Sequence, residues 1–138
     1  MSEKAKRDLT PNEWKIMDIV WRLRSCSAAE VVEIASERHG WAPTTVKTYL
    51  SILVDKGRLS AKKIGNSFLY RPRVSLRQSL WRVADNLLEK SIQGSGGPLL
   101  AYMIKKCELS PDEIAEIRRA LDEAETDETS QEKGGAER

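Results

Sequence analysis

The chain has 138 residues, with 23 Lys and Arg against 21 Asp and Glu and a net charge of +2. Its apolar runs are far shorter than the roughly 20 residues of a membrane-spanning helix, and its start has no apolar signal segment. The two cysteines, Cys26 and Cys107, lie far apart, which excludes a disulfide framework. These features predict a small cytoplasmic protein of one domain, or one domain with an appendage.

The charges are divided unevenly along the chain. Residues 1–73 carry 14 Lys and Arg against 8 Asp and Glu, whereas residues 74–138 carry 9 against 13. A basic first half indicates that only this half meets a polyanion such as nucleic acid. Residues 1–8 form a charged leader that we expect to be disordered.

Two helices are predicted at the start of the ordered region. Thr10 and Glu13 form a capping box with a proline between them, and the helix should run to about Arg24. Its apolar residues recur at the spacing of a core helix: Trp14, Met17, Val20, Trp21 and Leu23. A second capping box, Ser27 with Glu30, opens a helix that ends near Arg38, before Gly40.

Residues 43–56 are the stretch around which the chain is organised. One face of the predicted helix is apolar, with Val46, Leu50, Leu53 and Val54, and the opposite face carries Thr44, Thr45, Lys47, Thr48 and Ser51. Short polar and basic side chains at the leading end are typical of a helix that reads the DNA major groove. The alternative is an ordinary core helix with a solvated outer face.

A basic hairpin follows this helix. Residues 59–63 and 67–71 have the pattern of two short strands, joined by the turn signal Gly65-Asn66. Lys62, Lys63 and Arg71 flank the turn. Three helices followed by a basic hairpin is the element order of a winged helix, which we place at residues 9–73. The alternative, a small sheet that only covers the core, leaves the lysines unexplained.

The second half is predicted to be helical. Ser75 can cap a helix to about Gln93, residues 94–98 form a flexible break, and helices follow over residues 99–107 and from a third capping box at residues 110–113. Their apolar faces have too thin a core between them, which predicts a dimerisation region over residues 74–125. Its candidate contact residues are Leu80, Val83, Leu87, Leu100, Met103, Ile104, Ile114, Ile117 and Leu121. Residues 126–138 are expected to be disordered.

The residue pattern does not support an enzyme. There is one histidine, and the Gly-rich segment at residues 94–98 has no strand before it, so a linker explains it better than a phosphate loop. Neither a metal site nor a cofactor is expected, because Cys, His and carboxylates are not clustered. Cys26 and Cys107 are interpreted as buried thiols.

Several segments together resemble one family. LTPNEWKIMDIVW, SAAEVVE, WAPTTVKTYLSILVDKGRL, GNSFLYRP and GSGGPLLAYMIKKCELSPDEIAEIRRAL are similar to the penicillinase-repressor family of bacterial transcription repressors (the BlaI/MecI/CopY group), over about residues 9 to 122. The resemblance implies a mainly α fold, with a winged helix-turn-helix that binds operator DNA and a C-terminal helical region that forms the homodimer. Such repressors usually control antibiotic-resistance or copper-homeostasis genes.

The resemblance also assigns roles to residues. It implies DNA-facing positions at Thr44, Thr45, Lys47 and Thr48 and a wing at Lys62, Lys63, Gly65 and Asn66. Ala42 stands where many members carry Ser, so a side-chain cap is missing there. Members that respond to β-lactams are cut by a sensor metalloprotease at an Asn-Phe bond, where this chain has Tyr102-Met103. Its tail has no cysteine, so copper sensing is not expected.

These observations predict a homodimeric repressor that occupies a roughly palindromic operator and controls resistance or stress genes. The alternative function is a winged helix that binds protein, with its C-terminal helices as the docking surface.

Overall fold

The computed structural model describes residues 8–90 and 94–136. The chain divides into two compact units, residues 1–90 and 91–138. The predicted leader lies outside the described residues except for Asp8, as does the predicted end of the fourth helix at residues 91–93. In the part of the chain that is described, no helix has both the length and the apolar character needed to cross a bilayer.

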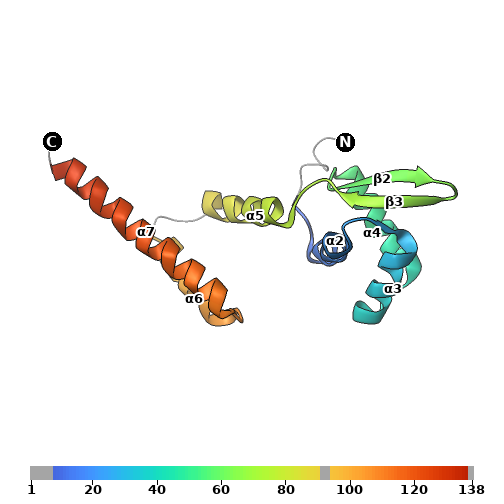
Figure 1. The fold of residues 1–138 in the computed structure, drawn as a ribbon, viewed down its shortest axis with the longest axis horizontal. Coiled ribbons are helices and arrows are strands. Elements are labelled where there is room, and N and C mark those ends of the chain that lie inside the picture. The colour runs from blue at the N-terminus through green and yellow to red at the C-terminus, as the bar shows by residue number, and fades with distance from the viewer. Residues whose placement is uncertain (1–7, 91–93, 137–138) are drawn as a thin grey trace. The chain divides into compact units, whose positions relative to one another are not determined.

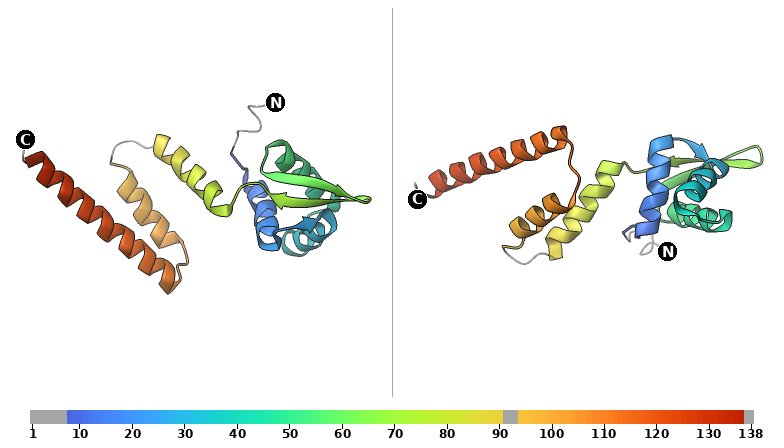
Figure 2. Two further views of the ribbon diagram at one scale, coloured as in Figure 1. Left: turned by 45° about the horizontal axis from the view of Figure 1, so that its top comes forward. Right: turned by 90° about the horizontal axis from the view of Figure 1, so that it is seen from below.

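The first unit contains a three-helix bundle, a small sheet and one further helix (Figures 1 and 2). The two predicted capping boxes are present, at Thr10 with Glu13 and at Ser27 with Glu30, and Gly40 ends a helix with a left-handed φ of 67°. In chain order the elements are α2 (Pro11–Leu23), β1 (Cys26–Ser27), α3 (Ala28–His39), α4 (Pro43–Asp55), β2 (Leu59–Ile64), β3 (Ser67–Pro72) and α5 (Leu76–Lys90).

The sheet is antiparallel with the strand order β1-β3-β2. The hairpin of β2 and β3 is in register from Leu59 opposite Pro72 to Ile64 opposite Ser67, and Gly65 in its turn has a φ of 60°. Glycine adopts this conformation without steric cost. The predicted hairpin is therefore present, whereas β1 was not predicted, because two residues are too few to show an alternating pattern.

The hydrophobic core lies entirely between residues 16 and 59. Met17 and Val20 are fully buried as predicted, but so are Ile16 and Ile19, which the sequence analysis did not place in the core. Trp21 is only partly buried, and its indole Nε1 donates to the Val74 carbonyl at 2.9 Å. Helix α2 therefore crosses the centre of the domain with a wider buried face than its predicted apolar stripe.

A buried ion pair joins the two ends of the bundle. The Lys56 Nζ, just past the end of α4, lies 2.5 Å and 2.8 Å from the two carboxylate oxygens of Glu13 in the first turn of α2. The two side chains are 12% and 3% exposed. The same carboxylate accepts the backbone N–H of Thr10 at 3.3 Å. Glu13 thus serves the helix cap and the contact between helices at once.

The second unit consists of α6 (Gly96–Lys106) and α7 (Pro111–Ala136). The predicted cap of α7 is present, with the Ser110 hydroxyl accepting the Glu113 N–H at 3.2 Å. None of the described side chains of residues 94–127 is buried. The described part of this unit therefore has two helices but no core of its own.

The helices extend beyond two predicted limits. Helix α6 begins at Gly96, inside the segment expected to be a flexible break, because Pro98 is tolerated in a first helical turn and the Leu99 N–H bonds the Ser95 carbonyl. Helix α7 continues to Ala136, where disorder was expected from residue 126. The extension includes Glu, Gln, Lys and Ala, which favour helix, but also Thr, Ser and two Gly, which do not, so its composition alone does not explain the helix.

We expect Lys56→Met to lower the free energy of unfolding by about 3–5 kcal/mol, because it leaves a buried carboxylate without its cation. In a Glu13→Gln background the same change should cost much less, since glutamine can still close the capping box. Urea denaturation of both single variants and the double variant measures the coupling. Arg22→Met is the control, because its pair with Asp18 is exposed and contributes at most about 1 kcal/mol. If the losses in free energy of unfolding of the two single variants simply add up in the double variant, the two side chains are not coupled and the role of the pair is contradicted.

Candidate nucleic-acid interface

Helix α4 has one buried apolar face and one exposed polar face, as the sequence predicted. Val46, Leu50 and Leu53 are fully buried, while the opposite face is exposed over its whole length: Thr44, Thr45, Lys47, Thr48 and Ser51. The buried side chains fix the helix on α2 and α3, so the outward face is held rigidly. A rigid face of short hydrogen-bonding side chains is suited to reading base edges in a major groove.

The start of α4 has free hydrogen-bonding capacity. Ala42 is the N-cap residue and provides no side-chain cap, as the sequence indicated. Backbone N–H groups in the first turn of a helix lack helical partners and attract anions. The Thr48 hydroxyl, by contrast, donates to the Thr44 carbonyl at 2.9 Å, so in this conformation it is occupied by its own helix.

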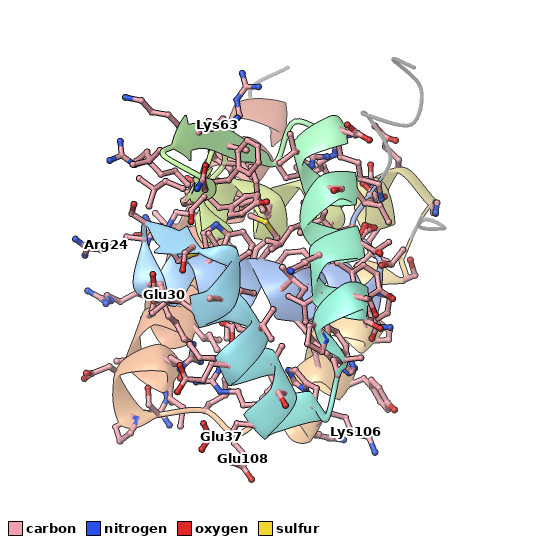
Figure 3. The ribbon with its side chains drawn as sticks, turned by 90° about the vertical axis from the view of Figure 1, so that its right-hand side faces the viewer. Arg24, Glu30, Glu37, Lys63, Lys106 and Glu108 are labelled. Carbon is pink, nitrogen blue, oxygen red and sulfur yellow. The ribbon has the colours of Figure 1, made fainter. Side chains whose placement is uncertain are left out.

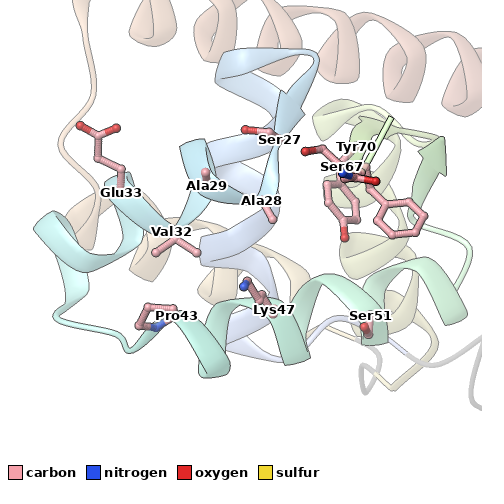
Figure 4. A pocket seen from close by; sticks show the side chains of 12 residues that line it. Ser27, Ala28, Ala29, Val32, Glu33, Pro43, Lys47, Ser51, Ser67 and Tyr70 are labelled. Atoms are coloured by element: carbon pink, nitrogen blue, oxygen red, sulfur yellow. The ribbon is translucent and has the colours of Figure 1, made fainter. Parts of the chain in front are cut away.

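A groove of about 700 Å³ opens between α3, α4 and the hairpin (Figure 4). Lys47 and Ser51 line it from α4, facing Ala28 of α3 and Tyr70 of β3. Glu33 lies at the α3 end, with its carboxylate directed away from Lys47 in this view. The groove gathers predicted site residues from two elements, namely Lys47 and Ser51 from α4 and Asn66 from the hairpin turn.

The remaining predicted residues of α4 lie around a second, shallower hollow of about 350 Å³. Thr44, Thr45 and Thr48 line it together with Tyr49 and Ile52. The α3 residues Ala28 and Ala29 in the wall of the main groove were not predicted. Their only signal in the sequence was the capping box before them, which places the start of α3 at the surface.

The two wing lysines point to opposite sides of the hairpin. Lys63 is directly opposite Phe68 in the register, and Lys62 is opposite Leu69. Side chains of successive strand residues alternate between the two faces. Phe68 lines the groove, so Lys63 lies on the groove side of the hairpin and Lys62 on the other side. In Figure 3, Lys63 and Glu37 lie at opposite ends of this view of the domain.

An aromatic stack supports the turn before α4. The Trp41 ring lies 5.0 Å from His39 and 5.4 Å from Tyr49, measured between ring centroids, and the Tyr49 hydroxyl accepts from Asn12 at 3.0 Å. These contacts connect α2, the turn and α4. His39, the last residue of α3, therefore packs as part of this support.

The two thiols have different environments. Cys26 is fully buried, and burial, with a smaller effect of the Glu30 charge, raises the pKa of its thiol to about 11. Cys107 is exposed, contrary to the expectation that both thiols are buried, because it follows α6 in the unit without a core. Among the described residues, no three His, Cys, Asp or Glu side chains are placed to hold a metal ion.

Residues 9–123 match the family model described as penicillinase repressor. The methicillin resistance regulatory protein MecI of Staphylococcus aureus (strain N315) is 29% identical over 114 residues, covering 83% of this chain and 93% of MecI. The penicillinase repressor of Bacillus licheniformis is 27% identical over 111 residues, covering 80% of this chain and 87% of that protein.

Among solved structures, the solution structure of the DNA-binding domain of the repressor BlaI is similar, with a TM-score of 0.50 and 28% identity. The match covers 56% of this chain and 93% of that domain. Together with the three helices and the hairpin, it identifies the first unit as a winged helix. The predicted fold class is thereby confirmed.

We expect a thiol reagent at pH 8 to modify Cys107 rapidly and Cys26 only when the protein unfolds, because the thiolate is the reactive form. Mass spectrometry after timed labelling should give one fast site per chain. Cys107→Ser should remove this fast site. Raising the pH to about 9.5 should not make Cys26 reactive, because its pKa of about 11 keeps the thiol protonated. Two equally fast sites would show that Cys26 is accessible.

Proposed function

The chain belongs to the penicillinase repressor family, and from this premise we propose that it represses transcription by binding operator DNA as a homodimer. Family membership confirms the expected class, a repressor rather than an enzyme. The observation that carries the proposal is the face of α4, which exposes three threonines, a serine and a lysine while its opposite side anchors it in the core.

In the proposed complex α4 enters the major groove. Lys47 meets a guanine edge or a phosphate, and the threonine hydroxyls bond base edges while their methyl groups contact thymine. Thr48 must exchange its bond to the Thr44 carbonyl to do so. Thr44 and Thr45, in the first turn, are the better placed of the threonines to act without that rearrangement.

In the same complex, the wing and the N-terminus of α4 contact the phosphates of the duplex. Lys63 lies on the groove side of the wing, and Gly65 and Asn66 form its tip. The uncapped N–H groups of α4 offer further phosphate contacts. Binding through several phosphates should weaken steeply as salt rises.

A second copy of the chain is the proposed partner of the C-terminal helices. Seven of the nine predicted contact residues are exposed, and the other two, Val83 and Ile117, are only partly buried. In α5 the only buried residue is Ser79. Helices with such bare apolar faces need a partner, and a symmetric pair also places two winged helices on two half-sites. Their joint binding is tighter than that of either one alone.

We place the protein in the cytoplasm, controlling resistance or stress genes, as the names of its relatives suggest. Tyr102 and Met103, at the position where family members are cut, are exposed but lie inside α6. Loop tips, rather than helices, are the usual sites of proteolysis. Release from the operator through cleavage of this bond by a sensor metalloprotease is therefore not part of the proposal.

A winged helix that docks protein instead of DNA is the second candidate. The bare apolar faces of α6 and α7 favour it. Salt distinguishes the two, because apolar docking should barely respond to ionic strength whereas phosphate contacts respond strongly.

We expect Lys47→Ala to weaken binding to a duplex selected from a random pool by the wild-type protein, by about 1–3 kcal/mol. Gel-shift titration measures the affinity, and sedimentation checks that the oligomeric state is unchanged. Lys90→Ala, an exposed lysine at the end of α5, is the control with the same charge change. Equal affinity of the Lys47 variant and the control would remove α4 from the interface.

A glutamate in place of Leu100, which is 60% exposed in α6, should convert the dimer to a monomer by burying a charge in the interface. Affinity for the same duplex should then fall by about 10²-fold or more, because the effective concentration of the second winged helix is lost. Analytical ultracentrifugation follows the dimer. Lys105→Glu introduces a carboxylate at a polar position of the same helix and should leave the dimer intact. A dimeric Leu100 variant would place the interface elsewhere.

A further inference from the structure

A hollow lined by three arginines lies in the first unit, where α5 leaves the winged helix. It has a volume of about 640 Å³ and shares no lining residue with the groove beside α4. Its arginines come from three segments: Arg58 before β2, Arg73 after β3, and Arg82 from α5. The Arg73 N–H donates to the Arg58 carbonyl at 2.9 Å, so these two side chains leave the backbone from adjacent points.

Basic side chains predominate in the lining of this hollow. The lining residues include three arginines and one carboxylate, Asp85, and a second carboxylate, Asp8, pairs with Arg82 at its edge. Arg58 is buried, with 9% of its surface exposed. Burial and then the charge of Arg82 lower the pKa of Arg58, while the carboxylates of Asp8 and Glu13 have the smaller, opposite effect. Like charges are thus crowded in a partly desolvated space, which an anion would stabilise.

The structure already contains a carboxylate bound at the edge of this site. One oxygen of Asp8 lies 3.3 Å from the Arg82 Nε, and the other accepts the Asn86 amide at 2.6 Å. Arg82 and Asn86 are four residues apart and so lie on the same face of α5. This pair can therefore hold a carboxylate through both of its oxygens.

We propose that the hollow binds a small organic or inorganic anion with at least two carboxylate or phosphate groups. One group lies between Arg58 and Arg73 on the winged-helix side, and the other competes with Asp8 for Arg82 and Asn86 on α5. Gln78 and Trp81 also line the hollow and complete its wall with an amide and an indole face. Such a ligand joins α5 to the winged helix across the segment that connects them.

The test is isothermal titration calorimetry of the full chain without DNA, with citrate and with pyrophosphate, at constant ionic strength. We expect one of them to bind with a dissociation constant below about 1 mM. Arg73→Gln should weaken this binding by about tenfold or more, because it removes a charged hydrogen-bond donor. Asp8→Asn should strengthen it severalfold, because it removes the competing carboxylate.

The control is Arg77→Gln, which removes an arginine from the same region of α5 that stands over the Trp81 ring but does not line the hollow. It should change the dissociation constant by less than about twofold. The citrate and pyrophosphate arms distinguish carboxylate from phosphate recognition. The assay contains no DNA, so its outcome is independent of the proposed repressor function.

Two results would overturn the proposal. The first is no binding of either anion at about 10 mM. The second is binding that Arg73→Gln and Arg77→Gln weaken equally, which would indicate a diffuse response to surface charge.

Discussion

The ion pair of Glu13 and Lys56 sets the geometry on which the rest of the winged helix depends. It connects the first turn of α2 to the residue that ends α4, and it is nearly inaccessible to water. A buried pair of this kind contributes little net stability but penalises any arrangement that separates its members. With the helix cap of α2 built on the same carboxylate, the orientation of α4 is coupled to the start of the domain. The outward face of α4 can therefore present its threonines and Lys47 in one direction only.

The two units of the chain solve the problem of burying apolar surface in different ways. The first unit encloses a core of mostly aliphatic side chains between residues 16 and 59. In the second unit α7 has a side-chain cap at Ser110 and α6 has none, and no side chain is buried among the described residues. Local capping can define where a helix begins, but it cannot compensate for an apolar face left in water. This difference is the physical basis for proposing that the C-terminal helices act in assembly while the winged helix acts in recognition.

Two separate places in the first unit bring basic side chains together. One is the face formed by α4 and the wing, where Lys47 and Lys63 lie on the side of the groove. The other is the hollow of Arg58, Arg73 and Arg82, which has no residue in common with it. The two hollows are similar in volume, about 700 Å³ and 640 Å³, but only the second includes a buried guanidinium, that of Arg58. A bound anion in the hollow would act on the connection between the winged helix and α5, and thus on the distance between two DNA-binding units in a dimer.

The sequence by itself determined the features that depend on residues three or four positions apart. These are the capping boxes at Thr10, Ser27 and Ser110, the two faces of α4, and the turn at Gly65. The family resemblance, carried by contiguous segments, was likewise confirmed. Only the tertiary structure decided what depends on distant residues: the Glu13–Lys56 pair, the pairing of β1 with β3, the burial of Ile16 and Ile19, the side of the wing on which each lysine lies, and the gathering of three arginines. Hydrogen bonds within one turn leave a local pattern in the sequence, whereas contacts across tens of residues arise only when the packed core has fixed which elements are neighbours.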